Sequence, residues 1–212
     1  SEHIVKARSV AWASDNRTLF YVGEDEAKRA SRLYRHVLGE KEDALIYEES
    51  DVRFSISVSR SRSHAYLFLT SHSATTSEVR FLPADAPQTE FTLIAPRRAE
   101  HEYYVEFGHG QFYIVTNDRG RNFRLVSVPA GDPSPQHWNE RIPHRDDVML
   151  EGVDVFARHL VAHERAKDEH ERVLGKRVHD RRLVAADQRG HERHSREQPE
   201  HPHEGHLAQR VD

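Results

Sequence analysis

Up to about residue 165, apolar and polar residues alternate with a period of two, which is the pattern of half-buried β-strands. Four such runs are "RTLFYV", "HAYLFLT", "QFYIVT" and "RHLVAHE". Equivalent positions in these runs are Phe20, Leu67, Tyr113 and Leu160, which are spaced by 47, 46 and 47 residues. The chain is therefore built from a repeat of nearly constant length.

Each run lies among further strand-like segments. The runs are preceded by "SVAWAS", "FSISVS", "YYVEF" and "GVDVF", and each of the first three is followed by two more segments. Turn-forming stretches such as "SDNRT" and "AGDPSP" separate them. Four short strands that recur every 40–50 residues or so indicate a β-propeller. A β-sandwich also has closely spaced strands, but the constant period favours the propeller.

We predict an all-β fold, a partial β-propeller of about three and a half four-stranded blades. The predicted blades cover residues 3–50, 51–98 and 99–148, followed by half a blade at 149–165. The next two strands are due near residues 169–175 and 188–193, where neither "EHERVLG" nor "QRGHER" alternates. We therefore expect residues 166–212 to form a polar tail outside the core, disordered or loosely helical.

Composition sets this tail apart from the rest of the chain. No Phe, Tyr, Trp, Ile or Met follows Asp168, and seven of the 17 histidines follow Lys167. Because Arg, His, Ala, Gly and Pro are typical of a GC-rich gene read out of frame, we interpret the tail as the product of a frameshift near codon 167. Five of its histidines could bind a divalent metal weakly and adventitiously, namely His191, His194, His201, His203 and His206. We expect no physiological metal site and no cofactor.

Charge and cysteine content narrow the function classes. The formal net charge is -4 with mixed signs, which gives no reason to expect nucleic acid or an anionic membrane as a partner. The chain has no Cys, so it has neither a disulfide framework nor a thiolate site. We find no apolar run of about 18 residues and no apolar segment typical of a signal peptide. These features lead us to expect a cytoplasmic protein.

Several longer segments resemble a known family: "WASDNRTLFYV", "SATTSEVRFL", "PRRAEHEYYVEF" and "FYIVTNDRGRNFRL". From about Val10 to Arg165 the chain is similar to the oligopeptidase B group of the prolyl oligopeptidase family of serine peptidases, and the likeness stops near Lys167. The resemblance implies a seven-bladed propeller that caps an α/β-hydrolase domain and admits only short peptides. It implies cleavage after Lys or Arg, with short basic peptides and the hydrolase domain as partners.

The resemblance also implies that the nucleophile, acid and histidine lie in the hydrolase domain, outside the matched part. The sequence agrees, because none of the ten glycines belongs to the G-x-S-x-G turn that exposes a hydrolase serine. We therefore expect no catalytic residue in this chain and no peptidase activity from the chain by itself. The alternative is a stand-alone propeller-type module that binds a protein or a metal.

Two acidic stretches are candidates for gating the access of basic peptides. "YEESD" contains Glu48, Glu49 and Asp51, and "RRAEHEY" contains Glu100 and Glu102. Their carboxylates could attract Lys and Arg side chains. The alternative, which we favour, is a pair of loops with ion pairs, each worth about 0–1 kcal/mol at a surface.

Two further groups of residues have a structural interpretation. The hydroxyls of "SATTSE" are expected to form turn hydrogen bonds to the backbone. The aromatic residues of the repeats are expected to form the blade core: Trp12, Phe20, Tyr21, Phe68, Phe112, Tyr113 and Phe123.

Overall fold

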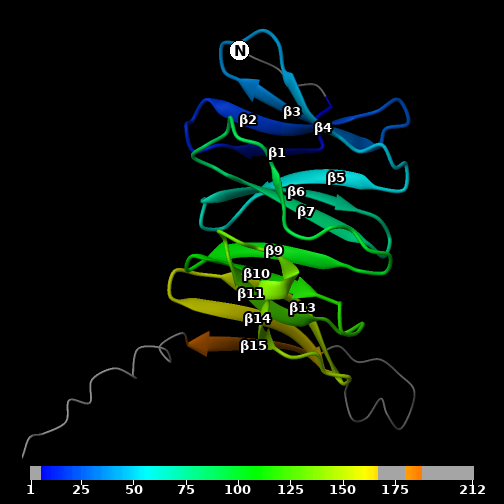
Figure 1. Ribbon diagram of the computed structural model, residues 1–212, viewed down its shortest axis with the longest axis vertical. Coiled ribbons are helices and arrows are strands. Elements are labelled where there is room, and N and C mark those ends of the chain that lie inside the picture. Colours follow the sequence, from blue (N-terminus) through cyan, green and yellow to red (C-terminus); the bar gives the residue numbers. More distant parts are fainter. Residues whose placement is uncertain (1–5, 167–179, 188–212) are drawn as a thin grey trace, which may run out of the picture.

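The computed structural model describes residues 6–166 and 180–187, and these residues form four antiparallel sheets (Figure 1). The first sheet consists of β1 (Ser9–Trp12), β2 (Thr18–Glu24), β3 (Ala30–Val37) and β4 (Ala44–Glu48). The second consists of β5 (Ser55–Arg60), β6 (Tyr66–His72), β7 (Ser77–Pro83) and β8 (Thr92–Leu93). The third consists of β9 (Tyr103–Gly108), β10 (Gln111–Thr116), β11 (Arg124–Pro129) and β12 (Asn139–Ile142). The fourth consists of β13 (Val148–Val155), β14 (His159–Ala166) and β15 (Asp180–Asp187).

In every sheet the strands follow one another in chain order, and neighbouring strands pair antiparallel. Figure 1 shows the four sheets stacked in sequence order from the blue first sheet to the yellow and orange fourth. Four-stranded meanders stacked in this way are propeller blades. The prediction of an all-β, partial propeller is confirmed, and the strands fall on the segments that the alternation indicated.

The core lies between successive sheets because alternate residues of one strand point to opposite faces. In β6, Leu67 packs with the first sheet, whereas Phe68 packs with the third. In β10, Phe112 faces the second sheet and Tyr113 faces the fourth. The second strands of the inner blades are therefore buried on both faces, and each fully buried large side chain contributes about 1.5–3 kcal/mol.

Two of the predicted core aromatics, Trp12 and Tyr21, are not part of the buried core. Trp12 is 42% exposed, because it lies on the face of β1 that points away from the second sheet. The neighbouring Ala11 points to the second sheet and is buried there. Tyr21 is half-buried and stacks on Tyr34, with ring centroids 5.2 Å apart. The outer face of the first sheet thus has no covering layer within the described residues.

The fourth sheet differs from the sequence prediction. We expected it to end after two strands at residue 165, but β15 pairs with β14 from His159↔Asp187 to Ala166↔Asp180. An open edge of β14 would leave backbone groups unpaired, and β15 satisfies them. The short apolar stretch of β15 has no alternating pattern, so periodicity did not indicate this strand. The other residues of the predicted tail, including the five candidate metal-binding histidines, lie outside the described residues.

The described residues contain no helix long and apolar enough to cross a membrane. Between residues 6 and 166 the one short helical segment is a 3-10 turn, η1 (Pro135–His137), which connects β11 to β12.

Candidate functional site

The antiparallel order of the strands divides the loops between two ends of the molecule. The connections between successive sheets lie at the same end as the turn between the second and third strands of each sheet, and we call this the connection end. The turns between first and second strands lie at the opposite end, which we call the turn end.

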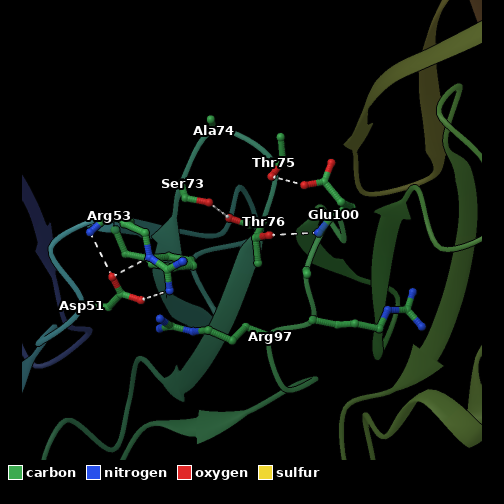
Figure 2. A pocket seen from close by; sticks show the side chains of 11 residues that line it. Asp51, Arg53, Ser73, Ala74, Thr75, Thr76, Arg97 and Glu100 are labelled. Atoms are coloured by element: carbon green, nitrogen blue, oxygen red, sulfur yellow. Dashed lines mark hydrogen bonds and ion pairs between the residues drawn. The ribbon is translucent and has the colours of Figure 1, made fainter.

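A cavity of about 500 Å³ opens at the connection end, where the β4–β5 connection, the β6–β7 turn and the β8–β9 connection meet (Figure 2). Its volume is in the range of small-ligand sites. The lining residues are Asp51, Arg53, Phe54, Ser73, Ala74, Thr75, Thr76, Arg97, Arg98, Ala99 and Glu100.

One wall of this pocket rests on a buried ion pair. Glu49 is only 3% exposed, and its Oε2 lies 2.6 Å from Nη2 of Arg97. The Arg97 guanidinium also lies over the ring of Phe54, 4.0 Å from its centroid. Burial raises the pKa of Glu49, but hydrogen bonds from Arg97 and from the Asp51 N–H outweigh burial, so the pKa is lowered overall. Glu49 is therefore a paired anion at neutral pH.

Asp51 and Arg53 form a second pair on the same side of the pocket (Figure 2). Arg53 donates from Nε to Oδ1 at 3.0 Å and from Nη2 to Oδ2 at 2.7 Å. Hydrogen bonds from the side chain and backbone of Arg53 lower the pKa of Asp51 to about 2. This bidentate geometry satisfies both oxygens of the carboxylate.

The opposite wall is a network of hydroxyl groups. The Thr75 hydroxyl donates to Glu100 Oε1 at 2.9 Å, and the Glu100 N–H donates to Thr76 Oγ1 at 3.2 Å (Figure 2). Ser73 donates through its hydroxyl to the Thr76 carbonyl at 3.4 Å. The expected turn hydrogen bond to the backbone is therefore present at Ser73, whereas Thr75 bonds to a side chain of the next connection.

The pocket brings together two of the five predicted gating residues, Asp51 and Glu100, and Glu49 lies beneath it. Glu48 forms a surface ion pair with Arg32 at 2.8 Å, away from the pocket lining. Glu102 also lies outside the lining and accepts a 3.3 Å hydrogen bond from the Tyr104 hydroxyl. Glu48, Glu49 and Asp51 thus form ion pairs, whereas the side-chain partners of Glu100 and Glu102 are hydroxyl groups. The role of these carboxylates in gating stays a prediction.

A loop near η1 contains serine, histidine and aspartate, but it lacks the geometry of a catalytic triad. The Ser134 hydroxyl lies 3.2 Å from His137 Nδ1, and Asp132 Oδ2 lies 3.0 Å from the same nitrogen. A triad requires the hydroxyl and the carboxylate to contact opposite ring nitrogens. Nor do residues 6–166 contain a group of three His, Asp or Glu side chains that could hold a metal.

A polar cluster that the sequence pattern did not indicate lies at the turn end and consists of Arg62, Glu106, Asp154, Phe156 and His163. We call it the inner-rim cluster. These residues come from three different sheets. A signal was available, because Glu106 and Asp154 lie on first strands one repeat apart, and Arg62 follows a first strand. Positions one repeat apart lie at the same end of neighbouring blades, so these side chains come close together.

The stacked antiparallel four-stranded sheets define the class of protein as a β-propeller domain. Residues 3–192 match the family described as "Prolyl oligopeptidase, N-terminal beta-propeller domain". The chain belongs to this family. The match continues past Lys167, where we expected the resemblance to stop, and so corrects that boundary.

Individual relatives agree with this assignment. The chain is 38% identical over 162 residues to the dipeptidyl aminopeptidase BI of Pseudoxanthomonas mexicana, covering 74% of this chain and 22% of that protein. It is 33% identical over 156 residues to the protease 2 of Moraxella lacunata, covering 68% of this chain and 23% of that protein.

Among solved structures, oligopeptidase B from Trypanosoma brucei with covalently bound antipain, in its closed form, superposes with a TM-score of 0.78. This match has 25% identity and covers 90% of this chain and 26% of the trypanosomal chain. Oligopeptidase B from Leishmania major gives a TM-score of 0.69 at 29% identity, covering 81% and 26% of the two chains. The chain therefore spans about a quarter or less of the length of these relatives.

Proposed function

We propose that this chain is a non-catalytic propeller portion of an oligopeptidase-B-like serine endopeptidase. In the intact enzyme it would limit access to short peptides, which the hydrolase domain cleaves after Lys or Arg. The superposition on oligopeptidase B from Trypanosoma brucei, over 90% of this chain, carries the proposal. The absence of a G-x-S-x-G sequence supports a non-catalytic role for this portion.

The outer face of the first sheet supports a larger ring. Val10, Tyr21, Tyr34 and Leu45 are paired across its four strands and form one apolar row. Val10 is 55% exposed and Leu45 is 50% exposed. In the second and third sheets, by contrast, both faces are covered by neighbouring sheets. We propose that a further blade covers this row in the intact protein.

The connection end is the proposed side for the hydrolase domain. In each of the first three sheets the chain enters the first strand and leaves the fourth strand at this end, so a domain that is joined to both ends of a propeller would attach there. The pocket lies on this side. Its walls come from the β4–β5 and β8–β9 connections and from the β6–β7 turn, which all lie at this end.

A second candidate activity is the release of dipeptides from a free N-terminus. The relative named dipeptidyl aminopeptidase BI favours it, because this relative has higher identity to the chain than protease 2. The two activities differ in one requirement, since dipeptide release needs an unblocked α-amino group and endopeptidase cleavage does not.

The test is to express the full-length protein encoded by the gene that contains this segment. Three fluorogenic substrates would be compared: an N-blocked Arg-Arg peptide, an N-blocked Gly-Pro peptide and a dipeptide with a free N-terminus. The proposal expects hydrolysis of the blocked Arg-Arg peptide and no degradation of denatured casein. Cleavage only after Pro, or only from a free N-terminus, would refute the proposed specificity. A gene without a hydrolase domain would instead support the stand-alone binding module.

A further inference from the structure

Arg62 connects the second sheet to the fourth at the turn end. It lies in the turn between β5 and β6, and its Nη2 donates to Oδ1 of Asp154 in β13 at 2.6 Å. The Arg62 guanidinium also lies over the ring of Phe156, 4.8 Å from the centroid. On its other side, Asp154 Oδ2 is 2.8 Å from Nε2 of His163. One carboxylate and one aromatic face therefore hold the guanidinium.

Glu106 brings a second carboxylate from the third sheet. It accepts hydrogen bonds from the backbone N–H groups of Phe107 at 2.7 Å and of Arg62 at 3.2 Å. Within the described residues no Arg, Lys or His side chain forms a salt bridge with it. The inner-rim cluster thus contains two carboxylates and one guanidinium, which leaves one negative charge in excess when His163 is neutral.

The surroundings of Glu106 oppose an uncompensated charge. Burial raises the pKa of Glu106, and the nearby Asp154 carboxylate acts in the same direction, against the two backbone hydrogen bonds and Arg62. A second cation beside Glu106 would relieve this strain on its charged form.

Solutes can reach the cluster. The side chains of Arg62, Asp154 and His163 are 49%, 33% and 41% exposed. A carboxylate next to an aromatic face is a chemical environment that binds a planar cation, through charge-assisted hydrogen bonds and the ring quadrupole. Guanidinium groups suit it better than metal ions, because no group of three metal-ligating side chains exists in this part of the chain.

We propose that the inner-rim cluster is a binding site for the guanidinium or ammonium group of a basic peptide side chain, with Arg62 as an internal occupant that the peptide displaces. The proposal rests on the proposed function for the source of the ligand, a peptide that contains Arg or Lys. Asp154 and Glu106 would bind the cation and Phe156 would stack on it. The site would select basic peptides at the end of the propeller opposite the pocket.

The experiment measures the binding of Nα-acetylarginine amide to the purified 212-residue chain by isothermal titration calorimetry. Nα-acetylcitrulline amide, which has the same shape without the charge, is the control ligand. Arg62→Gln removes the internal occupant and is expected to tighten binding about threefold to fivefold, the effect of removing a half-exposed ion pair. Asp154→Asn removes the main acceptor and is expected to weaken binding about tenfold.

Matched variants separate this effect from general changes in charge. Arg60→Gln alters an arginine beside the same turn, whose Nη2 bonds to Ser14 Oγ and the His64 carbonyl, and should leave the affinity unchanged. Asp132→Asn alters an aspartate in the η1 loop that is also paired with a histidine, and it should leave the affinity unchanged as well.

Equal or weaker binding by Arg62→Gln would overturn the proposal and leave Arg62 as a structural link between sheets. Equal binding of the citrulline ligand would also overturn it. If circular dichroism shows that Arg62→Gln does not fold, Arg62→Lys replaces it. Lysine keeps the charge but lacks the planar guanidinium fork, so it should compete less well with the probe for Asp154, and the probe should bind more tightly. Unchanged binding of the probe would count against the site. Because the assay involves no turnover, its result is independent of which bond the full-length enzyme cleaves.

Discussion

At the scale of single residues, two adjacent glutamates show how burial changes the contribution of an ion pair to stability. Glu49 and Arg97 are 48 positions apart, about one repeat, and meet under the pocket. Glu48 and Arg32 make a pair on the surface. The sequence "YEES" presents the two glutamates identically, and only the packing of the next blade distinguishes them.

We predict that Glu49→Gln lowers the free energy of unfolding by about 1–3 kcal/mol. Arg97 would lose its buried partner and keep only Glu78, at 3.6 Å, so part of its charge would be uncompensated. The matched control is Glu48→Gln, which should change stability by less than about 1 kcal/mol. Urea unfolding followed by tryptophan fluorescence measures both, and equal shifts would contradict this account of Glu49.

The contribution of Glu106 to stability should depend on pH in the opposite sense to that of Glu49. Because the pKa of Glu106 is raised in the folded state, its contribution to stability is present below the unfolded value of about 4.3 and is lost as pH rises through the folded pKa. Glu106→Gln, which does not titrate, should therefore raise the thermal midpoint at pH 7 and raise it less at pH 4. A gain of equal size at both pH values would contradict the effect. Glu49, with a lowered pKa, contributes above about pH 4.3 and loses its contribution as the pH falls.

At the scale of elements, the second sheet is completed by a side chain of the third. β8 has only two residues, and the N–H of Val79 in β7 is instead satisfied by the Tyr103 hydroxyl at 2.8 Å. The same hydroxyl donates to the Ala95 carbonyl at 2.6 Å. Tyr103 is fully buried, and burial raises its pKa to about 12. It acts as a substitute for the missing part of a fourth strand.

We predict that Tyr103→Phe destabilises the chain by about 1–3 kcal/mol, because a buried N–H of β7 would lose its acceptor. Tyr104→Phe is the matched control, since its side chain is 52% exposed and its hydroxyl contacts only Glu102, at 3.3 Å. Thermal unfolding by circular dichroism compares the two variants. A control variant as unstable as Tyr103→Phe would refute the role assigned to this hydroxyl.

Periodicity predicted the strands of the first three sheets and the first two of the fourth, because alternation and a repeat near 46 residues are local features of the sequence. It could not predict β15, where alternation is missing and the driving force is the open edge of β14. The acidic residues of two loops were visible in the sequence, but the partners of these residues were not. Arg97 reaches Glu49, and Arg62 reaches Asp154, across sheet boundaries, so these pairs depend on how the blades stack.

At the scale of the whole molecule, the apolar row of Val10, Tyr21, Tyr34 and Leu45 should make the isolated chain self-associate, since a large exposed apolar surface promotes association. The double variant Val10→Lys with Leu45→Lys should shift the chain toward monomer. Light scattering coupled to size-exclusion chromatography measures the change. A monodisperse wild-type monomer with a sharp thermal transition would contradict the expectation that another blade covers this face.

The central proposal is that this chain is a propeller portion without a catalytic centre of its own. The most direct test incubates the purified chain with a short N-blocked Arg-Arg fluorogenic substrate, beside a no-protein control, and treats it with a fluorophosphonate probe for reactive serines. The account predicts no turnover above the control and no labelled serine. Turnover that co-purifies with the chain and disappears in Ser134→Ala would contradict it, because it would assign a nucleophile to the loop where Asp132, Ser134 and His137 meet.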